Sequence, residues 1–173
     1  MALPKRKTIR LPEYDCSSPG AYFVTICTRD RRNLFWNTDV MPDPAVGAAI
    51  CRPQGDSSRL LPLTKAGKTV DLAIRNIHAI YPHVSVDKYV IMPNHVHMIV
   101  SIHADEHGRQ IAAPTVSTII GHMKRWASKQ AGEPLWQKSY HEHVIRGEAD
   151  YREIWDYVEN NSARWAEDRY YQT

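Results

Sequence analysis

Apolar and polar residues follow two periods along this 173-residue chain, one typical of strands and one typical of helices. Short apolar or alternating runs predict four strands, at residues 21–28, 86–92, 95–102 and 141–146. Residues 34–36 are a candidate for a further short strand. Apolar positions three and four residues apart predict helices at residues 64–80, 115–130 and 148–168, with residues 44–50 as a candidate for a short additional helix.

The predicted strands and helices alternate, with one hairpin expected around Pro93 and Asn94. This order favours an antiparallel sheet with helices packed on it, an α+β fold. The length and the 43% of hydrophobic residues suit a single domain spanning residues 1–173. Within it, residues 1–12 are expected to form a basic N-terminal arm. Residues 37–58, rich in Pro, Gly, Asp and Ser, are expected to form an irregular loop.

The chemistry of the chain is concentrated in the apolar run at residues 89–100, which contains His95-Val96-His97. Side chains alternate across a strand, so the two imidazoles are expected on one face and Val96 on the other. Neutral imidazole is a common metal ligand, and two on one strand leave coordination positions open for a substrate. The same tripeptide also occurs in strands without a metal, so the pattern needs support from elsewhere in the chain.

That support comes from the last predicted helix, whose core-facing stripe consists of Tyr151, Ile154, Trp155, Val158, Ser162 and Trp165. Tyr157 lies roughly 110° from the centre of this stripe, so its phenol is expected at a surface. Asn161 follows Tyr157 by four residues on the same face, and Glu153 precedes it by four. Tyr157 is therefore the candidate nucleophile. The alternative is a half-buried tyrosine beside a helix-end asparagine.

Basic residues are clustered, although the net charge is only +3. Such clusters attract a phosphate backbone, and each is also compatible with a solvated surface. The candidates for DNA binding are Lys5, Arg6, Lys7 and Arg10 in the arm, Arg29, Arg31 and Arg32 after the first strand, and Lys124, Arg125 and Lys129 on one helix. Three aromatic residues are candidates for base stacking as well as for the core: Tyr22, Phe23 and Trp126.

Taken together, these residues resemble the single-tyrosine HUH transposases of the insertion-sequence and REP-associated type. Residues 93–97, PNHVH, resemble the family's signature of histidine, bulky apolar residue and histidine. Residues 157–161, YVENN, resemble its tyrosine followed four residues later by a ligand amide. Residues 20–32 and 136–146 extend a similarity that covers most of 8–169. The chain departs from the family at Ser162, where proline is frequent, and in the length of residues 37–58.

The resemblance implies a ferredoxin-like sheet with His95 and His97 on a central strand and Tyr157 on the C-terminal helix. It also implies that Tyr157 attacks single-stranded DNA, forms a 5′-phosphotyrosine and later rejoins the strand. His95, His97 and Asn161 would hold one Mg²⁺ or Mn²⁺, and no nucleotide cofactor is expected. The expected partner is a single-stranded DNA hairpin. The oligomeric state stays open between a monomer and a homodimer.

Two further residues are candidates for assisting this site. His143, which forms a second His-x-His pattern with His141, is expected to support a metal ligand or to contact DNA. Glu153 and a metal-bound water are both candidates for accepting the proton of the Tyr157 phenol, and the sequence does not choose between them.

Other features bear on the cellular context and on the alternatives. No run of about 18 apolar residues is present, so no membrane span is expected, and the N-terminus does not resemble a signal peptide. Cys16, Cys27 and Cys51 lack metal-site spacing, which indicates reduced thiols in the cytoplasm, where a DNA-binding protein would associate with the nucleoid. Two alternative functions stay open: a domesticated hairpin-binding protein without transposition, and a metal-dependent phosphodiester hydrolase in which water attacks.

Overall fold

Four strands form the sheet: β1 (Gly20–Cys27), β2 (Val84–Ile91), β3 (His95–Ile102) and β4 (His141–Val144). The computed structural model describes residues 18–37, 63–104, 114–162, 165 and 170. The helices are α1 (Lys65–Arg75), α2 (Ile77–Ile80), α3 (Val116–Ala131) and α4 (Glu148–Asn160), with a 3-10 turn at Arg29–Arg31.

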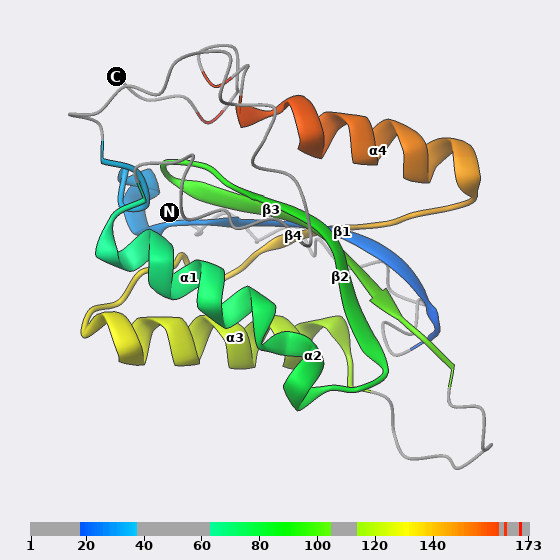
Figure 1. The fold of residues 1–173 in the computed structure, drawn as a ribbon, viewed down its shortest axis with the longest axis horizontal. Coiled ribbons are helices and arrows are strands. Elements are labelled where there is room, and N and C mark those ends of the chain that lie inside the picture. The colour runs from blue at the N-terminus through cyan, green and yellow to red at the C-terminus, as the bar shows by residue number, and fades with distance from the viewer. Residues whose placement is uncertain (1–17, 38–62, 105–113, 163–164, 166–169, 171–173) are drawn as a thin grey trace, which may run out of the picture.

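The strand order is β2-β3-β1-β4, and each neighbouring pair is antiparallel. The chain passes from β1 through α1 and α2 to β2, and from β3 through α3 to β4, which is the split β-α-β topology of a ferredoxin-like fold. The predicted α+β class and ferredoxin-like sheet are thereby confirmed. Figure 1 shows α1, α2 and α3 covering one face of this sheet, while α4 crosses the other.

The main core lies between the sheet and the layer formed by α1, α2 and α3. Strand residues enter it at every second position and helix residues at every third or fourth, as the two periods require. Its buried members include Tyr22, Val24, Ile26, Val70, Ile74, Val96, Met98, Val100, Ile119 and Ile120. Tyr22 is fully buried, so it belongs to the core and is not available to stack on a base.

The last helix is shorter than predicted. The prediction that it runs to residue 168 is wrong, because α4 ends at Asn160. Asn160, Asn161 and Ser162 are residues whose short polar side chains compete with the helix for backbone hydrogen bonds. Asn160 Nδ2 donates to the carbonyl oxygen of Asp156 at 2.8 Å, which is such a contact. The helix therefore ends without glycine or proline.

The other predicted bounds need smaller corrections. The predicted helix at 64–80 is divided into α1 and α2 at Asn76. Residues 34–36 are not a strand, because Trp36 forms an isolated bridge with Leu63. The last strand stops at Val144, two residues before its predicted end. The basic arm at 1–12, the candidate helix at 44–50 and residues 38–58 of the predicted loop lie outside the described residues.

Candidate active site

The two histidines of the His-Val-His motif lie on the α4 side of the central strand β3. In the register of the sheet, His97 lies opposite Thr25 of β1 and Val90 of β2, while His95 lies opposite Cys27. Strands therefore flank β3 on both sides, and the two imidazoles are 0% and 1% exposed. Polar rings at this depth need hydrogen-bond partners or a bound ligand.

Hydrogen bonds to the Nδ1 atoms orient both imidazoles. His95 Nδ1 lies 2.8 Å from Asn94 Oδ1, and because an amide oxygen only accepts, His95 is the donor. His97 Nδ1 lies 2.9 Å from the hydroxyl oxygen of Thr25. The two Nε2 atoms consequently face each other at 2.9 Å. If both Nδ1 atoms carry the protons, two lone pairs meet at that distance, and a shared proton or a cation would relieve their repulsion.

Tyr157 reaches this pair from α4. Its hydroxyl lies 3.3 Å from His97 Nε2, and the two rings meet edge to face with centroids 5.2 Å apart. Phe23 of β1 stacks on His97 at 5.3 Å and meets the Tyr157 ring edge-on at 5.9 Å. The side chain of Tyr157 is 43% exposed, in keeping with its predicted place at the border of the helix stripe. Tyr157 is therefore in contact with the histidine pair and accessible from solvent at the same time.

Asn161 follows Tyr157 by one helical turn and lies just past the end of α4. It is 5% exposed, and its Oδ1 is buried without a hydrogen-bond partner among the described residues. The chain on either side of it contacts the histidine pair: Tyr157 contacts His97, and the Trp165 ring lies 6.0 Å from that of His95. A buried acceptor without a partner is uncommon in proteins, so the side-chain oxygen of Asn161 is available to a ligand.

Tyr170 packs against His95. The ring of Tyr170 lies 4.8 Å from the His95 ring, and its carbonyl oxygen accepts a hydrogen bond from Asn94 Nδ2 at 2.7 Å. The guanidinium of Arg31 lies 5.1 Å from the centre of the Tyr170 ring. The side chain of Asn94 therefore binds both His95 and Tyr170.

Four residues of this site were not identified from the sequence: Thr25, Phe23, Asn94 and Tyr170. Thr25 carried a usable signal, because a polar residue stands out within the apolar first strand and alternation assigns it to one face. Phe23 lies two residues before Thr25, so its side chain is on the same face of β1. The contacts of Asn94 and Tyr170 depend on the tertiary fold, and no local pattern reveals them.

His143 lies on β4 and Glu153 on α4. His143 Nε2 lies 3.0 Å from a carboxylate oxygen of Asp150, which also accepts from the backbone N–H of Arg146 at 2.8 Å. The hydrogen bond from the Arg146 backbone is the main cause that lowers the pKa of Asp150, and the bond with His143 is the second. These contacts join β4 to the first turn of α4. Glu153 is exposed one turn before Tyr157, so it stays a candidate for the proton acceptor.

The predicted DNA-binding residues divide between the two faces of the sheet. Lys5, Arg6, Lys7 and Arg10 lie outside the described residues. Arg29, Arg31 and Arg32 are exposed after β1, where Arg31 contacts Tyr170 beside His95. Lys124, Arg125 and Lys129 belong to α3, on the face opposite α4 (Figure 1). Lys124 donates to the carbonyl oxygen of Gln137 at 2.6 Å, and burial lowers its pKa.

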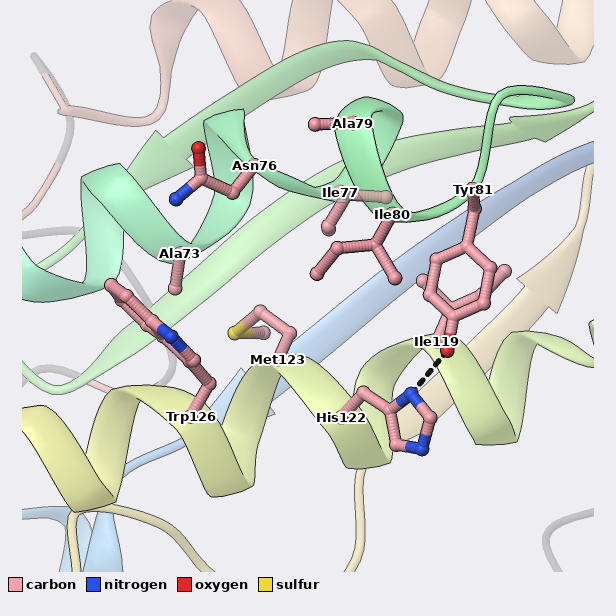
Figure 2. Close-up of a pocket in the computed structure, with 10 residues that line it drawn as sticks. All are labelled: Ala73, Asn76, Ile77, Ala79, Ile80, Tyr81, Ile119, His122, Met123 and Trp126. Atoms are coloured by element: carbon pink, nitrogen blue, oxygen red, sulfur yellow. Dashed lines mark hydrogen bonds between the residues drawn. The ribbon is translucent and has the colours of Figure 1, made fainter.

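A cavity of about 180 Å³ lies in the helical layer between α2 and α3 (Figure 2). Trp126 lines one end, and Tyr81, hydrogen-bonded to His122, lines the other. Ile80 and Met123 lie between these two ends. Because this layer and α4 cover opposite faces of the sheet, the cavity is separate from the candidate active site. Trp126, a candidate for base stacking, belongs to this cavity.

Comparison with known proteins assigns the chain to a family. A protein of Haemophilus influenzae, described as uncharacterized, is 31% identical over 185 residues, which cover 96% of this chain and 93% of that protein. The two chains belong to one family. No protein-family model matches the chain.

A solved structure shares the fold. It is a REP-associated tyrosine transposase bound to a REP hairpin, and it superposes with a TM-score of 0.57 at 20% identity, covering 95% of this chain and 74% of that chain. The chain therefore has the fold of a tyrosine transposase, as its HUH and tyrosine motifs implied. In the described residues, no helix combines the length and hydropathy that crossing a bilayer requires.

Proposed function

We propose that this chain is a tyrosine transposase that cleaves and rejoins single-stranded DNA at hairpins, through a covalent bond between Tyr157 and a 5′ phosphate. The observation that carries the proposal is the contact of 3.3 Å between the Tyr157 hydroxyl and His97 Nε2, at the point where His97 meets His95. Phosphoryl transfer needs a positioned nucleophile beside a group that stabilises phosphate charge. The transposase fold adds support.

The buried donor atoms fit one divalent cation. The Nε2 atoms of His95 and His97 face each other, and Asn161 offers a buried oxygen without a partner among the described residues. Two imidazole nitrogens and an amide oxygen suit Mn²⁺ or Mg²⁺. Such an ion, when bound, would polarise the scissile phosphate and offset the negative charge that grows on it. Thr25 and Asn94 hold the outer nitrogens and so keep both rings in a ligating orientation.

Tyr157 supplies the nucleophile. Its phenol gives up a proton to Glu153 or to solvent, and its oxygen bonds to phosphorus while the bond from phosphorus to the 3′ oxygen breaks. The products are a strand ending in a 3′-OH and a strand whose 5′ phosphate is esterified to the tyrosine. Because the phosphotyrosine keeps the energy of the phosphodiester, a 3′-OH can attack it and restore a strand without ATP. Phe23 and His97 pack against the phenol ring and keep its oxygen in place.

A single strand is the substrate that this surface suits. A backbone phosphate can reach a half-exposed phenol more easily in an unpaired strand than in a duplex. Arg31 contacts Tyr170 beside His95, and with the exposed Arg29 and Arg32 it would attract the strand that continues from the site. The solved neighbour is bound to a REP hairpin, so a hairpin with a single-stranded flank is the proposed substrate.

The test is a covalent-adduct assay. The protein is incubated with hairpin DNA labelled at either end of its single-stranded flank, with Mn²⁺ or with EDTA, and the products are separated on denaturing gels. We expect a Mn²⁺-dependent band of protein joined to the DNA 3′ of the cut, and a free strand ending in a 3′-OH. Tyr157→Phe should eliminate the adduct while leaving hairpin affinity within about twofold.

Tyr140→Phe is the matched control, because it removes a tyrosine hydroxyl that donates to Glu142 at 2.9 Å, away from the histidines. It should form the adduct at the rate of the unsubstituted protein. An adduct that persists in Tyr157→Phe would refute the assignment of the nucleophile. Cleavage without any adduct would instead identify a hydrolase, and binding without cleavage a domesticated hairpin-binding protein.

A further inference from the structure

Strand β2 contains a bulge directly beneath α4. Val86 pairs with Val100 and Lys88 with Ile99, so Asp87 is an extra residue in the ladder between β2 and β3. A bulge of this kind breaks the alternation of side chains and re-aims them locally. Here it lets the consecutive residues Asp87 and Lys88 both contact α4, which two neighbouring residues of a regular strand would not do.

Asp87 holds the first half of α4. Its carboxylate accepts a hydrogen bond from the Tyr151 hydroxyl at 3.0 Å. The hydroxyls of Ser85 and Ser101 donate to the same carboxylate and fix it on the sheet. Burial, followed by the charge of Asp87, raises the pKa of Tyr151 to about 12, so its hydroxyl remains a donor at neutral pH. The contact therefore joins α4 to a rigid part of β2.

Lys88 holds the second half of α4. It is 2% exposed, and its ammonium lies 3.1 Å from a carboxylate oxygen of Glu159 and 4.1 Å from the centre of the Trp155 ring. A buried ammonium is expensive, and an apolar side chain of similar size would often give more stability. Unlike an apolar residue, Lys88 can fix the rotation of α4 about its own axis. It does so because it contacts one flank of the helix at two positions a turn apart, Trp155 and Glu159.

Tyr157 lies on the other flank of the same helix. At 100° per residue, Tyr157 is about 180° around the axis from the midpoint of Trp155 and Glu159. A helix with its side chains is about 10–12 Å wide, so a roll of about 10° moves an outer atom by about 1 Å. Any rotation of α4 about its axis that the Lys88 contacts allow therefore displaces the phenol oxygen of Tyr157 relative to His97. A displacement of that size can cost about 100-fold in rate.

We propose that Asp87 and Lys88 are positioning residues: the β2 bulge fixes the roll of α4 and thereby places the Tyr157 hydroxyl at the histidine pair. This inference rests on the proposed function of Tyr157 for its kinetic consequence. The docking of α4 on the bulge is a property of the fold and can be tested separately.

The kinetic test compares Lys88→Met with Arg152→Met. Methionine keeps the length of the lysine stem and its packing while removing the charge. Arg152 pairs with Glu148 on the exposed side of α4, so Arg152→Met removes an ion pair from the same helix without touching the bulge. We expect Lys88→Met to slow adduct formation about 10- to 100-fold at saturating DNA, with hairpin Kd within twofold, and Arg152→Met to leave both unchanged. Lys88→Arg should recover part of the rate.

A double-substitution cycle separates positioning from a general loss of stability. Glu159→Gln alone should slow adduct formation, whereas adding it to Lys88→Met should cause no further loss, because both changes break one contact. Independent, multiplying effects would overturn the proposal. So would a Lys88→Met variant that matches Arg152→Met in rate, or one that is altered in Kd alone.

Amide hydrogen exchange of α4 provides a readout that does not require activity. Exchange at residues 153–160 should be faster in Lys88→Met than in Arg152→Met, because the helix is less firmly docked. If the unsubstituted protein forms no adduct, the proposed function fails, while this comparison still decides whether the bulge docks the helix. Equal exchange in the two variants would overturn the docking.

Discussion

Asn161 offers a direct test of whether the buried polar site is built for a cation. Its Oδ1 is buried and lacks a partner among the described residues, and such an acceptor costs about 1–3 kcal/mol of stability. Asn161→Leu replaces it by an apolar side chain of similar size at a 5%-exposed position just past the end of α4. The metal-free variant should therefore be more stable by about 1–3 kcal/mol, or roughly 2–10 °C in Tm.

Metal should reverse this order. A ligand that binds only the folded state at 100 times its Kd adds about 2.7 kcal/mol to the free energy of unfolding. The unsubstituted protein should gain this amount from Mn²⁺, while Asn161→Leu, left with two imidazoles, should gain much less. The variant is thus expected to be the more stable protein in EDTA and to lose that advantage in Mn²⁺.

Thermal and urea unfolding of EDTA-treated protein, with and without added Mn²⁺, measure both quantities. Asn160→Leu is the matched control, since Asn160 is exposed and its amide donates to Asp156 within the helix. It should change metal-free stability by less than about 1 kcal/mol and keep the full response to Mn²⁺. The reasoning is refuted if Asn161→Leu destabilises the metal-free protein by more than 1 kcal/mol, or if it responds to Mn²⁺ like the control.

Three further substitutions test one contact of the site and the packing of the helical layer. Thr25→Val removes the hydroxyl at His97 Nδ1 and should weaken Mn²⁺ binding about 10- to 100-fold in a calorimetric titration, while Thr69→Val, whose hydroxyl bonds within α1, should not. Equal affinities would contradict the orienting role of Thr25. Gly67→Ala should cost about 1–3 kcal/mol in urea unfolding, because a Cβ there would meet the carbonyl oxygen of Phe35. Gly121→Ala in α3 should stabilise the fold by about 0.5–1 kcal/mol, because the added Cβ would lie 3.9 Å from its nearest neighbour, an Arg125 side-chain nitrogen. A lower stability of Gly121→Ala would contradict the packing described.

Local periodicity predicted on which faces of their strand and helix the site residues lie, and the family resemblance predicted that these faces meet. Alternation in a strand placed His95 and His97 on one face, and helical spacing placed Tyr157 at the border of the core stripe. Both inferences need only a few neighbouring residues, and the structure has these side chains in contact. The roles assigned to them, including that of Asn161, remain predictions.

The docking of α4 could not be predicted in the same way. Strict alternation along the predicted strand at 86–92 puts Asp87 and Lys88 on opposite faces, and a bulge is visible only once β2 is paired with β3. Glu159 and Trp155 likewise carry no sign in the sequence that a buried lysine lies under them. Positions that depend on long-range register are therefore the ones that sequence reasoning missed.

The early end of α4 bears on the departure from the family at Ser162. Had the helix continued as predicted, its rise of about 1.5 Å per residue would have carried Tyr170 about 15 Å along the axis beyond Asn160. Instead the ring of Tyr170 lies 4.8 Å from His95, and that of Trp165 lies 6.0 Å away. Trp165 and Tyr170 can lie beside His95 because α4 ends at Asn160. Two asparagines and a serine therefore stand at the end of the helix, where proline is frequent in the family that the chain resembles.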